Sequence, residues 1–233
     1  VGSLLISLFI GDLVIRLLCQ VDVDGGITLG SRTLKPYALP LEKVKDRLAR
    51  YEQDSNQAFI RYHAQLGWIP RPNFRSEDDW YWHDPSGIRF DGAAIPQQKD
   101  TSRLRIALLG DSYVYGSEVP FSGTIGAQLQ QALALRGLNV DVLNFGTGGY
   151  GIDQAFLRYQ VQASAYQPDL VIAGFQPENV ARNGNVFRAF YTRNTQNPFF
   201  KPRFQLLPTG LERSLSRTPH PDSILATLQN WSD

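Results

Sequence analysis

The sequence RLRIALLGDSYVYGSEVP, residues 103–120, decides the fold of this chain. Its apolar run at residues 104–109 is typical of a strand buried on both faces, and the run stops at Gly110-Asp111-Ser112. The ligand crevice of an open α/β sheet lies beyond the carboxyl ends of its strands. Ser112 therefore reaches the mouth of such a crevice, and we take it as the first candidate nucleophile.

The chain on either side of this turn alternates between helical and strand patterns. Residues 122–137 and 152–166 show helical spacing, whereas residues 139–145 and 170–175 are short apolar runs. Strand, helix, strand, helix, strand with short connections predicts parallel pairing with right-handed crossovers. We expect an α/β fold, a three-layer α/β/α sandwich with a parallel sheet.

Three blocks of sequence resemble the GDSL or SGNH hydrolase family of esterases and lipases. They are Gly110-Asp111-Ser112 with Gly116, the segment NFGTGGY at 144–150, and PDLVI at 168–172 leading to Glu178-Asn179. The resemblance covers roughly residues 66–204 and implies the family's flavodoxin-like fold. The family's Asp-x-x-His block is absent, because none of the three histidines has Asp three residues before it. We expect a domain that is incomplete at its C-terminus.

The resemblance also implies roles for individual residues. Ser112 is the nucleophile, and its own N–H, Gly149 and Asn179 form the oxyanion site. The family's Gly-x-Asn-Asp is replaced here by GFQPENV at 174–180, which leaves Asn183 as a substitute for Asn179. Asp111 and Asn144 are expected to support the turns.

Two other residues near these blocks, Asp111 and His83, could take part in acid–base catalysis. Asp111 could act as a base, but a side chain one residue before the nucleophile rarely reaches its hydroxyl, so turn support is favoured. His83 lies between Trp82 and Asp84. Sequence neighbours do not make a catalytic relay, and we expect a surface or loop histidine.

Composition excludes several classes of function. The 233 residues carry a net charge of +1 and are 42% hydrophobic, which favours a sizeable core and argues against a nucleic-acid partner. Residues 146–151 match the dinucleotide fingerprint G-x-G-x-x-G, but no carboxylate ends the next strand. We therefore expect neither a cofactor nor a metal. The single cysteine, Cys19, excludes an internal disulfide.

The opening segment, residues 1–18, is strongly apolar. Its 18 residues would span about 27 Å as a helix, close to a bilayer core, although Asp12 and Arg16 oppose insertion. We expect a membrane anchor or signal segment; a buried amphipathic helix is the alternative. The resemblance to anchored bacterial members favours an extracytoplasmic domain, whereas the basic residues after the segment favour the cytoplasmic face.

The remaining chain divides into a connector and a main domain. Residues 19–66 read as a connector with a charged helix, and residues 67–233 as the hydrolase-like α/β domain. Aromatic residues at 67–96 could line a ligand groove. Aromatic and basic residues alternate at 183–218, which is either an ordered loop or an insertion that binds an anionic or carbohydrate ester.

The resemblance to the GDSL or SGNH family thus implies a serine esterase that acts through an acyl-enzyme. Its substrate would be a carboxylic ester, either a lipid or an O-acylated carbohydrate. The alternative is an inactive SGNH-fold fragment or a binding scaffold. The sequence leaves the oligomeric state open.

Overall fold

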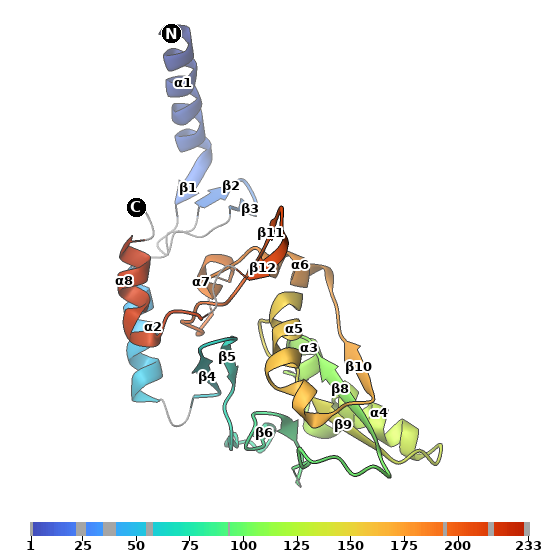
Figure 1. Cartoon of the computed structure of the whole chain (residues 1–233). Helices are drawn as coiled ribbons and strands as arrows, with labels where there is room; N and C mark the ends of the chain where they lie inside the picture. The colour runs from blue at the N-terminus through green and yellow to red at the C-terminus, as the bar shows by residue number, and fades with distance from the viewer. Residues whose placement is uncertain are drawn as a thin grey trace.

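A computed structural model describes residues 2–21, 27–34, 41–54, 58–92, 94–192, 195–213 and 217–230. Its centre is a five-stranded sheet in the order β10-β8-β9-β7-β6 (Figure 1). Three of these strands are those predicted from the apolar runs, namely β8 (Leu104–Leu109), β9 (Val140–Asn144) and β10 (Leu170–Ala173). They pair in parallel, with Ile106 opposite both Val142 and Leu170. The strand–helix alternation is therefore confirmed as an α/β arrangement.

The wholly parallel sheet is a wrong prediction. Two further strands, β6 (Trp82–His83) and β7 (Arg89–Phe90), come from the aromatic stretch and pair antiparallel. β7 joins β9 through the antiparallel pair Arg89 and Asn144. These strands are only two residues long. Such short segments carry no detectable period in the sequence, so the mixed character of the sheet is not visible there.

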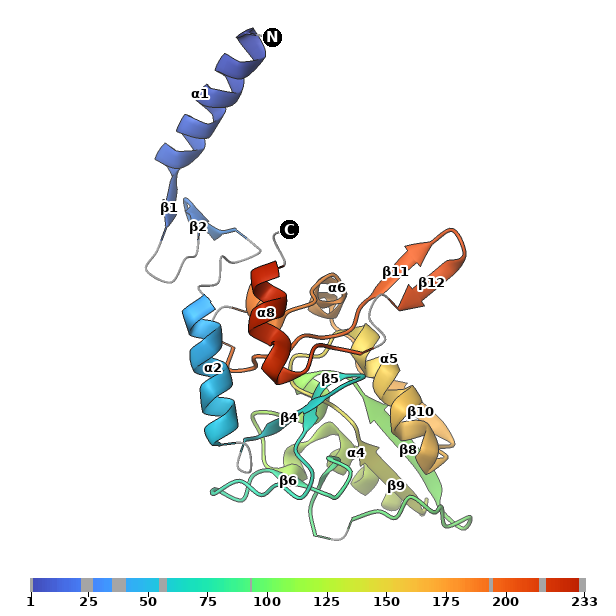
Figure 2. The ribbon, with the colours of Figure 1, turned by 60° about the vertical axis from the view of Figure 1, so that its left-hand side comes forward.

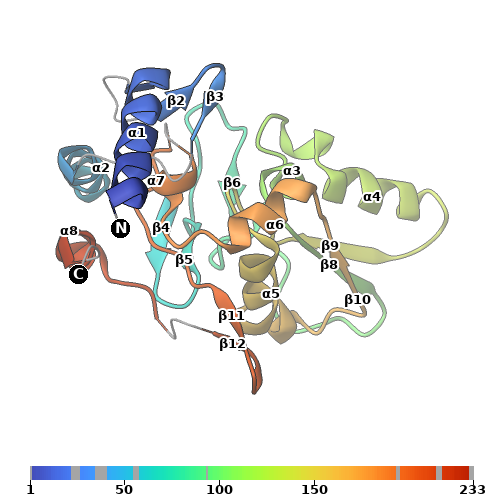
Figure 3. The same ribbon diagram turned by 90° about the horizontal axis from the view of Figure 1, so that it is seen from above.

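Different helices pack on the two faces of β8 and β9, as Figure 3 shows from above. On one face Ala107, Leu109 and Leu143 pack with residues of α5 (Ile152–Val161) and the turn that follows it. On the other face Ile106, Leu108 and Val142 pack with Leu129 and Leu133 of α4 (Ile125–Ala134). Alternate residues of a strand point to opposite faces, which is why one apolar run supplies both cores.

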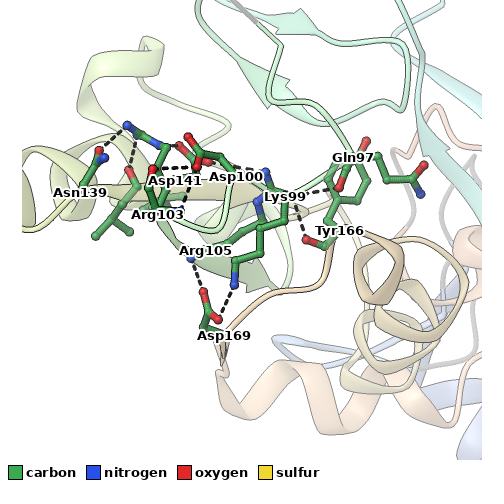
Figure 4. A network of polar contacts seen from close by, with 12 residues as sticks. Gln97, Lys99, Asp100, Arg103, Arg105, Asn139, Asp141, Tyr166 and Asp169 are labelled. Atoms are coloured by element: carbon green, nitrogen blue, oxygen red, sulfur yellow. Dashed lines mark hydrogen bonds and ion pairs between the residues drawn. The ribbon is translucent and has the colours of Figure 1, made fainter.

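Charged residues tie the sheet together where its strands begin (Figure 4). Arg103 Nε donates to Asp141 Oδ1 over 2.6 Å, and the Arg105 backbone N–H donates to Asp169 Oδ2 over 2.7 Å. The buried Arg105 guanidinium donates to the carbonyls of Gln97 and Tyr166. Lys99 forms an ion pair with Asp169. This network lies at the end of the sheet opposite to Ser112.

A further core, here called the aromatic core, joins segments far apart in the sequence. It contains Val44 and Leu48 of α2 (Leu41–Gln53), Ile224 of α8 (Ile224–Gln229), and Trp68, Tyr150, Phe187, Phe199 and Phe200. In Figure 2 α2 and α8 lie side by side. The charged helix of the predicted connector thus packs on aromatic residues of the main domain. The expected boundary at residue 67 falls within a hairpin of β4 (Ile60–His63) and β5 (Gly67–Pro70).

One edge of the sheet, formed by β10, is exposed to solvent. All four residues of β10 are exposed, with Leu170, Val171 and Ile172 between 38 and 51% accessible. Within the described part of the chain, β8 is the only strand that pairs with β10. A second hairpin, β11 (Phe204–Leu207) with β12 (Gly210–Arg213), projects elsewhere from the surface.

The apolar opening segment folds as α1 (Gly2–Leu18), followed by a small sheet of β1 (Cys19–Val21), β2 (Ile27–Leu29) and β3 (Arg32–Thr33). α1 extends away from the rest of the chain (Figure 1), and Arg16 Nε binds Asp12 Oδ2 at 2.7 Å on its surface. None of the described helices is both long and apolar enough to cross a bilayer. The spanning helix expected for a membrane anchor at residues 1–18 is therefore not supported in the described part of the chain, where the charged pair of Asp12 and Arg16 interrupts the apolar segment.

His83 lies in the interior, so the surface or loop position predicted for it is wrong. It is 2% exposed and stands among the rings of Phe59, Phe74 and Tyr115. Its Nε2 is 2.7 Å from the Tyr115 hydroxyl, and its Nδ1 is 2.8 Å from the Arg71 carbonyl oxygen. Burial lowers the pKa of His83 to about 4.

We expect the Gly146→Ala variant to be destabilised by about 1–3 kcal/mol, as in other overpacked sites. A Cβ at this position would lie 2.7 Å from Tyr115 Cα and 2.8 Å from Val114 C. Both are backbone atoms, which cannot move away as the end of a flexible side chain can. Urea denaturation measures the change. Gly148→Ala is the control, because a Cβ there meets nothing within 4 Å. Equal stability of both variants would contradict the close approach.

We also expect His83 to make folding stability fall with acid. The folded state holds the pKa of His83 near 4, below the ordinary value of 6.5, so the unfolded chain takes up the proton first as the pH falls. Between pH 7.5 and pH 5 this group alone removes about 2 kcal/mol of unfolding free energy. Denaturation at both pH values, compared with His83→Gln, measures its share. An unchanged pH dependence in the variant would show that His83 titrates normally.

Candidate functional site

The three parallel strands end together, and backbone hydrogen bonds hold the turns that follow them. Phe145 N donates to Leu108 O over 2.8 Å, Thr147 N to Gly110 O over 3.0 Å, and Gly174 N to Leu109 O over 2.8 Å. The turns after β8, β9 and β10 therefore form one edge. All the residues predicted for the site lie in or near these turns.

Ser112 begins α3 (Ser112–Tyr115), directly after the turn that ends β8. It is half-buried and opens onto a hollow of about 490 Å³. The start of α4 and Glu178 and Arg182 of α6 (Pro177–Asn183) also line this hollow. A hydroxyl at the edge of a hollow of this size can meet a small ligand.

Asp111 is the centre of the polar contacts behind Ser112. Its Oδ1 accepts from Tyr113 N over 3.0 Å, and its Oδ2 accepts from Gln176 Nε2 over 2.6 Å and Asn179 Nδ2 over 2.9 Å. Arg182 Nη1 lies 3.1 Å from the same oxygen. Burial by itself raises the pKa of Asp111, but these donors and the Arg182 charge outweigh it and leave the pKa below its usual value. Asp111 is thus ionised and fully engaged in holding the turn.

Asn179 is buried at the start of α6, where it lies against Asp111. Its Oδ1 accepts from Gln176 N over 2.7 Å, and its Nδ2 donates to Asp111 Oδ2 and to Tyr150 O over 3.2 Å. Both amide hydrogens therefore have acceptors within the protein. The structure places Asn179, and not its substitute Asn183, next to Asp111; Asn183 Oδ1 instead accepts weakly from Asp153 N, over 3.4 Å. A role of Asn179 as oxyanion donor stays a prediction.

Asn144 connects the end of β9 to α3. Its Nδ2 donates to Val114 O over 2.8 Å and lies 3.4 Å from Tyr115 O, while its Oδ1 accepts from Gly146 N over 2.9 Å. The side chain thereby satisfies carbonyls at the end of a short helix, which have no partner inside it. These bonds fix the turn after β9 against the helix that carries Ser112.

Gly149 lies in this turn with a left-handed backbone, φ of 81°, which favours glycine. A Cβ at this position would stand 3.1 Å from Arg188 Nε and 3.5 Å from Trp68 Cζ2. Trp68 Nε1 donates to Gly148 O over 3.0 Å and so fixes the neighbouring peptide. The space beside Gly149 is therefore bounded by an indole and a guanidinium.

Arg158 of α5 supports the same turn from beneath, and no sequence pattern predicts this role. Its Nη1 donates to Phe145 O over 2.8 Å and Gly146 O over 3.1 Å, and it also contacts Thr147 Oγ1. Its Nη2 donates to Gly87 O over 2.9 Å. The side chain is fully buried, and burial lowers its pKa. An arginine within a helical pattern normally signals a solvent-exposed face, which explains why the sequence does not reveal it.

None of the three histidines lies among the described residues that line the Ser112 hollow. Both ring nitrogens of His83 have partners in the interior. His63 Nδ1 accepts from the backbone N–H groups of Gln65 and Leu66, both over 3.2 Å. His220 is exposed beside Asp222, with Nδ1 3.2 Å from Oδ2. The contacts given for each histidine are thus with groups other than Ser112.

Comparison with known proteins gives a partial match. Three solved structures resemble part of the chain: the esterase AlinE4, described as a SGNH-hydrolase family esterase, and two of its mutants. The native esterase is 22% identical with a TM-score of 0.32, and the alignment covers 36% of this chain and 46% of that one. The two mutants align with the same TM-score and coverage, at 22 and 21% identity. This chain thus spans about half the length of the structures it matches.

No curated protein matches the chain. A family model does match, over residues 106–199, and its description is GDSL-like Lipase/Acylhydrolase. The matched part contains the Ser112 turn, the glycine turn after β9 and the whole of α6. Residues 106–199 are thus similar to the GDSL-like lipase/acylhydrolase family, as the three sequence blocks predict.

Proposed function

We propose that this protein hydrolyses carboxylic esters with Ser112 as the nucleophile. The observation that carries the proposal is the position of Ser112, at the end of β8 and on the wall of a 490 Å³ hollow, inside the segment that matches the family model. Ester hydrolysis by this route needs a nucleophile, donors for the oxyanion and a base. The residues of the three turns are candidates for the first two.

In this proposal the Ser112 Oγ attacks the ester carbonyl carbon and its proton passes to a base. The carbonyl oxygen becomes the oxyanion, and the backbone N–H groups of Ser112 and Gly149 stabilise it. Collapse of the tetrahedral intermediate expels the alcohol and leaves an acyl-serine, which water then hydrolyses to the acid. Small-molecule, lipid and O-acylated carbohydrate esters all fit this chemistry.

Asn179 is the proposed third donor to the oxyanion. In this role it must exchange one of its present hydrogen bonds for a bond to the oxyanion. One of its amide hydrogens points to Asp111 Oδ2 and the other to Tyr150 O. The bond to Tyr150 is the longer of the two, at 3.2 Å, so it is the one to be exchanged for the oxyanion. The bond to the charged Asp111 then keeps the amide oriented.

The proposed base is a histidine of an Asp-x-x-His outside these 233 residues. The three histidines within the sequence support this, because each is bonded elsewhere and none lines the hollow formed by the described residues. We further propose that the domain is a three-layer sandwich, with α4 and α5 as the outer layers that the two cores indicate.

We expect Ser112→Ala to abolish hydrolysis of 4-nitrophenyl acetate, because no other group replaces the attacking oxygen. The assay measures nitrophenolate release by the chain and by a version that carries the downstream coding sequence. The control is Ser122→Ala, an exposed serine in the same region. Full activity of Ser112→Ala, or a folded but inert longer version, would exclude this mechanism and favour a binding domain.

We expect Asn179→Ala to lower kcat on the order of 100- to 1000-fold, the usual effect of losing one oxyanion donor. It should also reduce the unfolding free energy by about 1–3 kcal/mol, because the buried Asp111 loses a donor. Steady-state kinetics and denaturation measure the two effects separately. Asn183→Ala is the matched control. A variant that is less stable but keeps the wild-type kcat would make Asn179 a purely structural residue.

A further inference from the structure

Arg188 is the first residue of α7 (Arg188–Tyr191), and aromatic packing fixes its position. The preceding residue, Phe187, is fully buried and packs on Phe200 with ring centroids 4.7 Å apart, and on Phe190 at 5.2 Å. Lys201 N also donates to Val186 O over 2.8 Å. The backbone that carries Arg188 is thus anchored in the aromatic core.

The guanidinium of Arg188 faces the turn after β9. Its Nε and Cζ lie 3.1 and 3.3 Å from the position that a Cβ of Gly149 would occupy. Only the absence of a side chain at residue 149 leaves room there. Any group that binds to the Gly149 N–H from this side is therefore next to the guanidinium.

The guanidinium of Arg188 lies over the ring of Tyr191, 5.8 Å from its centroid, but one of its nitrogens has no acceptor among the residues that the structure describes. Its Nη1 is buried without a hydrogen-bond acceptor, and no carboxylate forms an ion pair with it in the described part of the chain. The nearby Arg182 differs, because Asp111 and Glu178 both bind it, each at 3.1 Å. A guanidinium N–H without an acceptor is costly to bury, so an acceptor from outside the protein is expected.

The groups around Arg188 shift its pKa in opposite directions. Burial and the like charge of Arg182 lower the pKa of Arg188 to about 10, while Glu178, Tyr191 and Asp111 act against this. At neutral pH the guanidinium is still protonated. Asp111 and Glu178 both direct oxygens to Arg182, and none of the ion pairs among the described residues involves Arg188.

We infer that Arg188 is a specificity residue that binds an anionic group of the substrate beside Gly149. This inference rests on the proposed function and narrows it to esters that carry a carboxylate or another oxyanion near the scissile bond. A planar guanidinium can donate two parallel hydrogen bonds to such a group. A neutral ester would leave the buried N–H unpaired and would gain nothing from Arg188.

Two pairs of esters test this inference. The mono-4-nitrophenyl ester of succinic acid carries a carboxylate in the acyl half, and 4-nitrophenyl butyrate is its neutral counterpart. 4-Acetoxybenzoate carries the charge in the alcohol half, and its methyl ester is neutral. Arg188→Gln should lower kcat/KM for at least one charged ester on the order of 10- to 100-fold and leave its neutral counterpart unchanged. Arg188→Lys should restore part of the preference.

The matched control is Arg136→Gln, which removes the same charge from an exposed site just beyond the C-terminal end of α4. It should leave the ratio of charged to neutral ester unchanged. A loss in Arg188→Gln that is equal for charged and neutral esters would assign Arg188 to the oxyanion or to structure. No loss at all would mean that water alone satisfies the guanidinium. Either result overturns the inference.

A binding experiment separates this inference from the proposed function. In the Ser112→Ala background, NMR titration with monomethyl succinate and with the carboxylate 4-acetoxybenzoate does not depend on turnover. We expect at least one of them to bind on the order of tenfold or more tightly than in Ser112→Ala/Arg188→Gln, and methyl butyrate to bind both proteins equally. Equal binding of both anions to the two proteins would overturn the role of Arg188. Full esterase activity in Ser112→Ala would instead overturn the nucleophile, and the binding result would still decide the anion site.

Discussion

The carboxylate of Asp111 is the interaction on which the site depends. It follows β8, yet its acceptor oxygens bind the start of α3 and three side chains of the segment after β10. One buried charge thereby joins two of the three turns that form the edge. Taking any of its donors away leaves an ion in the interior with fewer hydrogen bonds, which is strongly unfavourable. The arrangement therefore suits a turn that must hold Ser112 in one place.

The third turn is fixed by different means. Asn144 connects it to α3, Arg158 donates to three of its oxygen atoms, and Trp68 donates to the Gly148 carbonyl. Each of these side chains uses backbone carbonyls as acceptors. Gly146 allows the backbone to come close to α3, and Gly149 allows it to come close to the side chains of Arg188 and Trp68. A turn held in one position by its surroundings is what a preorganised site requires.

The sequence predicts the parts of this molecule that short-range patterns encode. The strands β8, β9 and β10, the turns after them and the helices α4 and α5 follow from apolar runs and helical spacing. The short strands β6 and β7 do not, and neither does burial of His83, because both depend on contacts with distant residues such as Phe59 and Tyr115. Arg158 escapes prediction as a site residue for the same reason, and Arg188 is foreseen only as one of the basic residues of the segment 183–218. Nothing near a charged residue in the sequence says whether carbonyls or solvent will surround it.

The exposed strand β10 has a consequence for the behaviour of the protein in concentrated solution. Leu170, Val171 and Ile172 present β-branched and aliphatic side chains, and Phe175 beyond them is 61% exposed. The outer edge of such a strand offers a row of backbone N–H and C=O groups to any other extended chain. Lysine or proline on an edge strand protects many natural sheets, and the sequence LVIA contains neither. We therefore expect association of this protein at high concentration to begin at β10.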